Sequence, residues 1–552
     1  MEELYSTFGD ELVATIARHF DLGDDPAAAV SYYLKAARHA LTVYADEEAL
    51  AAISRVLELS DDLHLRFDAL ALRESIYHRH GSREEQQADL SLMTEIAEEL
   101  GDDDLICEVL RRQIDLQDVL GERESQARFI DELTDCAAGG KLRWQAVALQ
   151  AQALYHFRRS NDPAIRPPLE QAISIYQQLG DLAAQVDCYC LIVDYLTERD
   201  EFSDMDALLA QATALLTDID SPALQARVLT ATAKVARWQA NYAKELQLAT
   251  QLLTLYQLMH DRKGEADSHL MVVMANYSLS DFTPSLEHYF AAKRLYAQLG
   301  NLEGEARITG ILGAVFNRFG RYRDSLKAFQ QAQALYQKLE NKQRLLIAAM
   351  NIAIMAVQLN DYTLAIASAK QGLALLDYVQ HTQFEAVLLS TIGAVELWQG
   401  QPKEAIEHLT ATLALQANSA ARDFDEYLEH DLLALAYLHL GDLASARQHN
   451  DAALALTLYS NDPSKVFNPV SVNWVNACVE RAAGRIEVAR DYMLQAYAAL
   501  EEKMAAAERE LAVLPGDEWR TTFLNAPYHR DVLAAYERDE WPAYTSPPPA
   551  IP

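Results

Sequence analysis

The stretch "NRFGRYRDSLKAFQQAQALYQKLE", residues Asn317 to Glu340, reads as the end of one helix, a glycine turn and a second helix. Forty positions later, "VQLNDYTLAIASAKQGLALLDYVQ" (Val357 to Gln380) repeats this layout. Apolar residues in both stretches recur at three and four positions and never alternate strictly, so strands are excluded. Stacked helix hairpins explain the fixed interval, because one hairpin alone cannot bury its apolar face.

The interval of 40 extends along much of the chain. An aromatic residue opens the second helix of each unit at Phe202, Tyr242, Phe282, Tyr322 and Tyr362. Small residues follow three and ten positions later, where a neighbouring helix must approach closely. They are Ser285, Ser325, Ala365, Ala405 and Ala446, and then Ala212, Ala292, Ala332, Gly372 and Thr412. The sequence therefore predicts an all-α protein, an α-solenoid of antiparallel helix hairpins without a β-sheet.

The composition excludes several classes of protein. Half of the 552 residues are hydrophobic, enough to bury a core, and the net charge of -34 repels polyanions, so bulk nucleic-acid binding is not expected. Five cysteines without a CxxC motif do not make a disulfide framework, and we expect them to be reduced. The charged N-terminus is unlike a signal peptide and no apolar run spans a bilayer. A cytoplasmic protein without a membrane anchor is expected.

The rhythm of the repeats divides the chain into five segments. Residues 1–60 form N-terminal helical hairpins, 61–160 are degenerate helical repeats, and 161–461 carry the regular array. A break with Pro463 and Pro469 then leads into C-terminal capping helices at 462–538. Residues 539–552 are rich in proline and are expected to be unstructured.

One repeat unit resembles the tetratricopeptide repeat. The matching consensus positions are Leu312, Gly313, Phe316, Gly320, Tyr322, Ser325, Phe329 and Ala332. The interval of 40 in place of 34, and the absence of the consensus proline after the second helix, depart from that family. The resemblance implies a right-handed superhelix that binds a protein or peptide partner, with the first helix of each hairpin on the concave side.

Repeats of about 40 residues resemble those of the sensor arms of STAND-type bacterial ATPases and transcription regulators. The segments Leu12 to Leu59 and Arg520 to Arg538 resemble the beginning and the end of such arms. This resemblance implies a bacterial protein in signal transduction or transcription regulation. The chain has no GxxxxGK[ST] motif, since "AAGGKLRW" lacks the first glycine and the Ser/Thr after Lys141.

No pattern of residues points to catalysis, a metal or a cofactor. His78 and His80 are two positions apart, which does not aim both at one metal from a helix, and there is no HExxH or GxSxG motif. Acidic clusters such as Asp102 to Asp104 suit a helix start or a solvated face. We therefore expect a protein that is not an enzyme, with no catalytic residue, metal or cofactor.

Extending the register of Gly313 to the other hairpins predicts the residues that line the concave side. Along the chain, the predicted concave surface is basic in the earlier hairpins and apolar in the later ones, although the protein as a whole is acidic. Its candidate binding residues are Arg227, Lys234, Arg237, Trp238, Tyr277, Arg307, Asn317, Arg318, Met350 and Trp398. Arginines there could hold a carboxylate or phosphate in a bidentate manner, and the apolar strip could hold aliphatic groups.

Two alternatives stay open at this point. The basic residues could instead pair with acidic residues on facing helices, and the apolar strip could be buried as core. The favoured function is a scaffold or sensor that binds a protein segment or a small effector in its groove. The alternative function is an adaptor for oligomerisation or assembly that uses its convex face and terminal helices.

Overall fold

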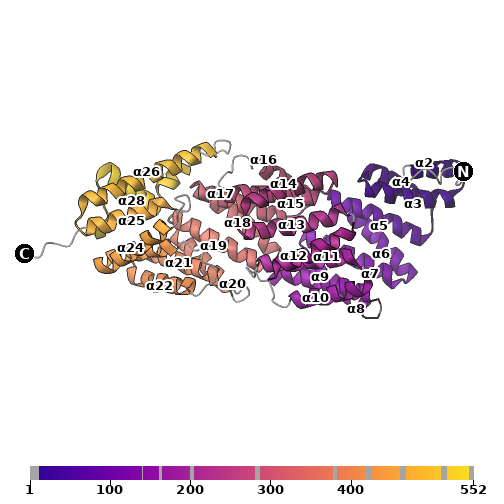
Figure 1. The fold of residues 1–552 in the computed structure, drawn as a ribbon, viewed down its shortest axis with the longest axis horizontal. Coiled ribbons are helices and arrows are strands. Elements are labelled where there is room, and N and C mark those ends of the chain that lie inside the picture. Colours follow the sequence, from indigo (N-terminus) through magenta and orange to yellow (C-terminus); the bar gives the residue numbers. More distant parts are fainter. Residues whose placement is uncertain are drawn as a thin grey trace, which may run out of the picture. The chain divides into compact units, whose positions relative to one another are not determined.

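The computed structural model describes residues 12–139, 141–160, 165–198, 204–219, 221–279, 286–376, 382–417, 426–459, 468–510 and 519–545. They form the helices α2 to α28 and the short 3-10 helices η3 and η6, with no strand in this part of the chain (Figure 1). The prediction of an all-α solenoid is confirmed. Phe202, Phe282 and Ser285 lie outside the described residues. The chain divides into two compact units, residues 1–308 and 309–552.

Ten helices come first in the described part of the first unit. They are α2 (Val13–Leu22), α3 (Pro26–Thr42), α4 (Asp46–Leu59), α5 (Leu63–His80), α6 (Arg83–Leu100), α7 (Asp103–Leu120), α8 (Arg123–Ala138), α9 (Leu142–Ser160), α10 (Arg166–Leu179) and α11 (Leu182–Glu198). The rest of the unit continues in the same way. It contains α12 (Met205–Leu215), η3 (Leu216–Asp218), α13 (Pro222–Trp238), α14 (Tyr242–Leu258), α15 (Arg262–Ser278) and α16 (Leu286–Leu299). The next helix, α17 (Leu302–Arg318), contains the division between the units.

The second unit continues the hairpins and ends in shorter elements. Its helices are α18 (Tyr322–Lys338), α19 (Lys342–Gln358), α20 (Tyr362–Leu375), α21 (Thr382–Trp398), α22 (Pro402–Ala417), α23 (Glu426–His439), α24 (Leu443–Tyr459), α25 (Pro469–Ala482), α26 (Ile486–Glu510), α27 (Trp519–Leu524), α28 (Pro527–Arg538) and η6 (Ala543–Thr545). None of the described helices in either unit combines the length and the apolar run that a bilayer crossing requires.

Odd-numbered helices form one layer within each unit. Each pairs with the even-numbered helix that follows it, as α5 with α6, α13 with α14 and α19 with α20. In addition, α11 packs on α13, α19 on α21 and α23 on α25. Apart from α26 and α28, which pack on each other, successive even-numbered helices make no comparable contact in the described part of the chain. We call the odd-numbered helices from α5 to α25 the inner layer, because helices on the inside of a curved array lie closest together.

The small residues of the 40-residue register lie where helices touch. At Gly313, an added Cβ would come within 2.9 Å of the Phe329 ring, so only glycine fits at this crossing. The hydroxyl of Ser325 donates a hydrogen bond of 2.7 Å to the Gly313 carbonyl across the same contact. The other described members are also buried, namely Ala212, Ala292, Ala332, Ala365, Gly372, Ala405, Thr412 and Ala446. Close packing is therefore the reason for the register.

A second register of tyrosine and glycine was not anticipated from the sequence. Tyr256 and Tyr296 lie 40 positions apart, and each packs on a glycine eight positions further along, Gly264 and Gly304. A Cβ on either glycine would lie 2.1 Å from the tyrosine ring. The repeated Tyr-x7-Gly pattern was the sequence signal for these contacts.

Helices far apart in the first unit also touch. The guanidinium Nε of Arg83 donates a hydrogen bond of 3.1 Å to the carbonyl of Leu299, 216 positions away. Leu299 also packs against Gly81, and α5 packs on α15. Helices α5 and α6 are thus held to α15 and to the end of α16.

The segment after α28 differs from the expectation of an unstructured tail. Trp541 stacks on Trp474 with ring centroids 5.3 Å apart, and Tyr544 stacks on His439 at 4.1 Å. Aromatic burial thus orders this proline-containing stretch up to Thr545. Residues 546–552 lie outside the described residues.

Candidate binding surface

All ten candidate residues lie on odd-numbered helices, and the two units share them. Arg227, Lys234, Arg237 and Trp238 lie on α13, and Tyr277 lies on α15. Arg307 lies on the part of α17 that belongs to the first unit. Asn317 and Arg318 end α17 in the second unit, where Met350 lies on α19 and Trp398 ends α21. All ten side chains are partly exposed.

A buried carboxylate neutralises two of the predicted basic residues. Asp194 on α11 accepts hydrogen bonds of 2.9 Å from Arg227 Nη2 and 2.6 Å from Lys234 Nζ. Burial alone would raise the pKa of Asp194, but Lys234 and Arg227 hold it below its ordinary value. The carboxylate is therefore ionised, and it already occupies the place that an anionic ligand of these two residues would take.

Arg237 forms a similar pair with a carboxyl group on its partner helix. Its Nε donates a hydrogen bond of 2.7 Å to Oε1 of Glu245 on α14, which is 1% exposed. Burial raises the pKa of Glu245 to about 7 despite the attraction of Arg237. Arg237 Nη2 and Glu245 Oε2 find no hydrogen-bond partner in the described part of the chain. This buried pair is therefore joined by one hydrogen bond, and one polar atom of each side chain is left without a hydrogen-bond partner among the described residues.

Arg307 faces a third carboxylate, Asp267 on α15. Asp267 accepts a hydrogen bond of 2.6 Å from the Tyr296 hydroxyl and one of 2.9 Å from Lys263 Nζ. Burial opposes ionisation here, but Lys263 and Arg307 lower the pKa of Asp267 to about 2. The basic residues of the first unit therefore lie beside carboxylates, of which Asp194 and Glu245 are buried and Asp267 is partly exposed.

The apolar strip of the second unit has a different environment. Met350 packs against a cluster of buried residues that includes Leu346 and Leu388, so it lies at the edge of the core. Trp398 is met edge-on by Tyr528, with ring centroids 5.3 Å apart. Tyr528 belongs to α28, so a distant part of the same chain covers this part of the strip.

Residues 519–545, which we call the C-terminal segment, contact the C-terminal ends of several inner-layer helices or the turns after them. Phe523 stacks on Tyr322 after α17, and the Asn525 carbonyl accepts a hydrogen bond of 3.0 Å from Asn360 after α19. Tyr528, Tyr544 and Trp541 then meet α21, α23 and α25. Figure 1 shows α28 between α25 and α26, and it contacts both. The segment thus follows the repeats at about one contact per hairpin.

Basic side chains gather beneath this segment. Burial and the neighbouring Arg318 lower the pKa of Lys503 on α26 to about 8. His529 is 3% exposed, and burial together with Lys503 lowers its pKa to about 3. Its Nδ1 lies 2.8 Å from the carbonyl oxygen of Phe523, which holds the ring in place. Arg318 therefore lies in a cationic environment close to the docked segment.

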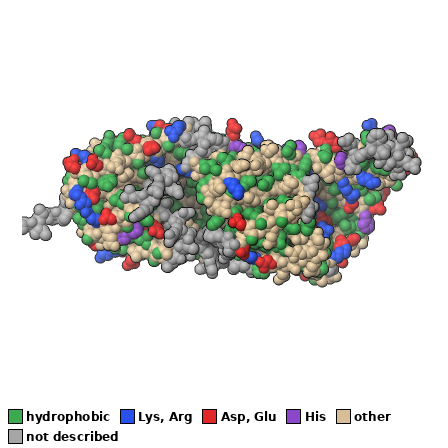
Figure 2. All heavy atoms as spheres, viewed as in Figure 1, with side chains coloured by type: hydrophobic (Ala, Val, Ile, Leu, Met, Phe, Trp, Pro, Cys, Tyr) green, Lys and Arg blue, Asp and Glu red, His purple; other side chains and the backbone are tan. Residues whose placement is uncertain are grey.

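The described residues contain no group of three or more His, Cys, Asp or Glu side chains that could hold a metal ion. Figure 2 shows acidic and basic side chains interspersed over the face in view. The arrangement offers partly exposed aromatic, apolar and paired ionic groups, which suit recognition of another molecule.

Comparison with known families agrees with this geometry. The family model described as tetratricopeptide repeat matches residues 304–377, which contain α18, α19 and α20. Residues 304–377 carry tetratricopeptide repeats. The match includes the whole of the stretch Asn317 to Glu340. It also includes the stretch Val357 to Gln380 apart from its last three residues. No curated protein matches the chain in sequence.

One solved structure shares the fold over a longer range, and two others are reported as similar. The anaphase-promoting complex hetero-tetramer Cut9–Hcn1 is 13% identical, with a TM-score of 0.52 over 93% of this chain and 98% of that one. A STAND protein with a tetratricopeptide repeat sensor from Pyrococcus horikoshii is 13% identical, with a TM-score of 0.42 over 75% of this chain and 64% of that one. A Rap protein complexed with Competence and Sporulation Factor is 12% identical, with a TM-score of 0.38 over 81% of this chain and 100% of that one.

Sequence reasoning missed the partners of the predicted residues. Asp194 and Glu245 have no pattern that distinguishes them from exposed acids, although Glu245 lies at the small position three residues after Tyr242. A carboxylate at a position otherwise held by Ser or Ala was the available signal. For Tyr528 the signal was the aromatic content of the segment around α28.

Proposed function

We propose that this chain is a non-enzymatic tetratricopeptide-repeat scaffold whose inner layer binds a helical protein segment. The docking of the C-terminal segment on the inner layer of the second unit carries this proposal. An inner layer that receives α27 and α28 of its own chain has the chemistry to receive a helix of another protein. The same register in the first unit presents Trp238 and Tyr277, both partly exposed.

Charge pairing favours an aromatic or apolar segment over an acidic ligand. An acidic group approaching Arg227 or Lys234 would have to displace Asp194, and one approaching Arg237 would have to displace Glu245. Breaking such a pair leaves a buried charge without its partner, which is costly. A helix that presents aromatic side chains to Trp238 and Tyr277 leaves these pairs intact.

The resemblance of the terminal segments supports a proposal for the place of this scaffold in the cell. Leu12 to Leu59 and Arg520 to Arg538 resemble the ends of STAND-type sensor arms, which supports a role as a cytoplasmic regulatory arm in bacteria. Binding across several repeats would alter the curvature of the array and bias an associated ATPase between two states. The gene upstream tests this role, because an ATPase that ends in a winged helix is expected there.

Photo-crosslinking in the full chain tests the binding surface. Benzoylphenylalanine replaces Tyr277 in the inner layer or, as a matched aromatic control, Phe290 on α16, which is 53% exposed. We expect a protein partner from the source cell to crosslink at position 277 and not at 290, with a helix of the partner at the crosslink. Crosslinking at 290 alone would place binding on the convex side and overturn the proposal.

Charge reversal at Arg237 with Arg307 is a poor probe of the same surface. Arg237→Glu would set a second carboxylate beside buried Glu245, and Arg307→Glu would do the same beside Asp267. Both changes should unfold the first unit, so that loss of binding would say nothing about contact. Tyr277 avoids this problem because the replacement is also aromatic.

The alternative function is an adaptor that oligomerises through its terminal helices. The observation in its favour is that the C-terminal segment is a discrete set of contacts that a second copy could exchange. Removing residues 462–552 would expose the core around Trp474, which is 0% exposed, and is therefore too disruptive. Light scattering of the full chain and of a chain ending at residue 518 tests this function. An adaptor requires a dimer that the shorter chain loses.

A further inference from the structure

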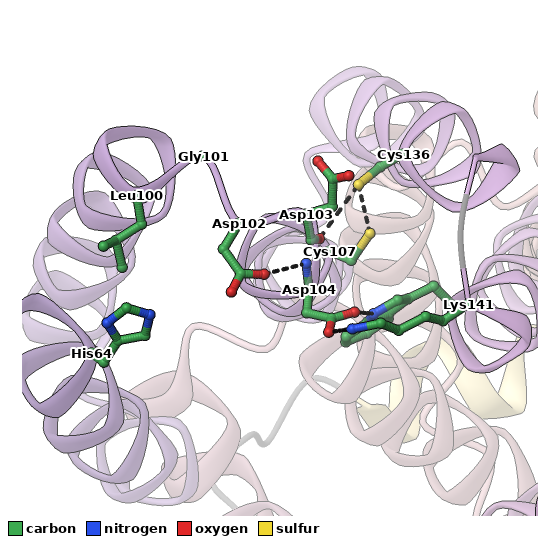
Figure 3. Close-up of a pocket in the computed structure, with 10 residues that line it drawn as sticks. His64, Leu100, Gly101, Asp102, Asp103, Asp104, Cys107, Cys136 and Lys141 are labelled. Carbon is green, nitrogen blue, oxygen red and sulfur yellow. Dashed lines mark hydrogen bonds and ion pairs between the residues drawn. The ribbon is translucent and has the colours of Figure 1, made fainter.

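A pocket of about 420 Å³ opens between hairpins of the first unit (Figure 3). Helices α5 to α9, the turn between α6 and α7, and Lys141 just before α9 supply its lining. The lining residues are His64, Leu100, Gly101, Asp102, Asp103, Asp104, Cys107, Cys136, Lys141 and Trp144. No candidate residue of the binding surface belongs to it, so this pocket is independent of the function proposed above.

Two thiols face each other at the edge of this pocket. Sγ of Cys107 on α7 lies 2.7 Å from Sγ of Cys136 on α8, and both cysteines are free (Figure 3). An S–S bond is about 2.05 Å long, so bond formation needs a movement well below about 1 Å. Because α7 and α8 pack side by side in one hairpin, neither helix has to move as a whole.

The two sulfurs differ in access, and the remaining cysteines are shielded. Cys107 is 1% exposed, whereas Cys136 is partly exposed toward the pocket. Cys188, Cys190 and Cys478 are all 0% exposed. A reagent that enters the pocket therefore reaches Cys136 first and finds Cys107 in contact behind it.

We propose that Cys107 and Cys136 form a reversible dithiol–disulfide site that small cationic disulfides oxidise through this pocket. The lining gives the charge preference, because it contains three aspartates and one lysine. Lys141 is already ion-paired with Asp104, which also accepts a hydrogen bond of 2.9 Å from Trp144 Nε1. With Lys141 and Asp104 paired, the remaining charges of the lining are those of Asp102 and Asp103. The pocket therefore attracts cations and repels anions such as glutathione disulfide.

The chemistry balances in two exchange steps. The Cys136 thiolate attacks one sulfur of R–S–S–R, which forms the Cys136–S–S–R mixed disulfide and releases R–S⁻. The Cys107 thiolate then attacks Cys136 Sγ, which forms the Cys107–Cys136 bond and releases the second R–S⁻. The protein loses two electrons and two protons, and the reagent leaves as two molecules of R–SH.

The pH dependence follows from the second step. Burial, the contact with Cys136 and nearby Asp103 all raise the pKa of Cys107. Only the thiolate attacks a disulfide, so the reaction should accelerate as the pH rises from 7 to 9. The three aspartates, Lys141 and His64 are the charged or titratable groups that face the pair across the pocket.

Mass spectrometry of the full, folded chain treated with cystamine tests the site. We expect a product 2 Da lighter than the reduced chain, with peptides containing residues 107 and 136 linked and the other three cysteines unmodified. A phosphine reductant should restore the starting mass. At low ionic strength, cystamine should react about tenfold faster than glutathione disulfide, and salt should narrow this ratio.

Serine variants distinguish the role of Cys136, which attacks the reagent, from that of Cys107, which resolves the mixed disulfide. Cys107→Ser should stop at the mixed disulfide on Cys136, one R–S group heavier, and Cys136→Ser should stay unmodified because Cys107 is shielded. A wild-type chain that accumulates a stable mixed disulfide, or stays unmodified while Cys107→Ser reacts, would overturn the proposal. Faster reaction of glutathione disulfide would overturn the assigned charge preference.

Discussion

The ring of Tyr528 meets the indole of Trp398 edge-on, with centroids 5.3 Å apart, although 130 positions of sequence separate the two residues. The contact joins the last long helix of the chain, α28, to the end of α21 in the inner layer. It shows that the candidate strip of the second unit is covered at Trp398. The energy of this contact decides how firmly the segment is held.

Replacing Tyr528 by alanine should weaken the docking of the C-terminal segment. Loss of a partly buried aromatic side chain and its edge-on partner should lower the free energy of unfolding of the second unit by about 2 kcal/mol. Limited proteolysis followed by mass spectrometry should show earlier release of residues after 518. Glu537→Ala, at an exposed position of the same helix, is the control and should cost much less. Tyr536 is unsuitable because its ring stacks on Tyr497 of α26.

Gly304→Ala should destabilise the first unit although alanine favours helices. The added Cβ would lie 2.1 Å from the Tyr296 ring, and overpacking of this kind costs about 1–3 kcal/mol. Urea denaturation measures the loss. Gly139→Ala, where nothing lies within 4 Å of the added Cβ, is the control and should be close to neutral. Equal stability of the two variants would contradict the packing described for α17.

Asp194→Asn should be strongly destabilising because it leaves Arg227 and Lys234 facing a neutral amide. Removing one member of a buried ionic group costs about 3–5 kcal/mol, and the partial exposure of Lys234 should bring the loss toward about 2–3 kcal/mol. Asp68→Asn breaks a surface pair with Arg38, whose side chains are 50% and 55% exposed, and should change stability by less than about 0.5 kcal/mol. Chemical denaturation compares the two variants directly.

Glu245 should make the stability of the first unit depend on pH. Its folded pKa of about 7 lies above the ordinary 4.5, so the folded state binds more protons between these values. The contribution of Glu245 to the free energy of unfolding is therefore greatest below pH 4.5 and falls as the pH rises to 7. Denaturation at pH 5 and pH 8 should show this fall in the wild type. Glu245→Gln should reduce the fall, whereas Glu58→Gln at an exposed site should leave it intact.

Lys503→Met should stabilise the second unit at neutral pH. The folded pKa of Lys503 is about 8 against an ordinary 10.5, because burial and, to a lesser extent, the nearby Arg318 disfavour its charged form. The wild type gains stability as the pH rises from 8 to 10.5, because the unfolded state binds more protons there. Methionine removes the charge and keeps the length, for an expected gain of about 1 kcal/mol near pH 7. A lower melting temperature for the variant would contradict this environment for Lys503.

Much of the fold could be predicted because one local rule repeats. Small residues such as Ser325 and Ala365 mark helix contacts within a window of about ten positions, and the apolar stripe marks the buried face. The same register placed all ten candidate residues on odd-numbered helices. Helical phase is a property of neighbouring residues, so a single sequence reveals it.

What could not be predicted depends on contacts between distant residues. The pairing of Lys234 with Asp194 crosses 40 positions, and the docking of Tyr528 on Trp398 crosses 130. Each depends on how helices stack in space, which no local pattern records. The ordered stretch around Trp541 was missed for the same reason, because its prolines are visible in the sequence and its partner Trp474 is not.

The hydrogen bond from Arg83 to the Leu299 carbonyl has a consequence for how the first unit comes apart. Linear repeat arrays fray from their ends, one module at a time, because each module touches only its neighbours. Here α5 and α6 are held to the end of α16 through the contacts of Gly81 and Arg83 with Leu299. These two helices therefore cannot unfold without breaking contacts to a helix about 200 positions later. Melting in this region becomes a joint event across more than two hundred residues, and the array gains the cooperativity of a globular domain.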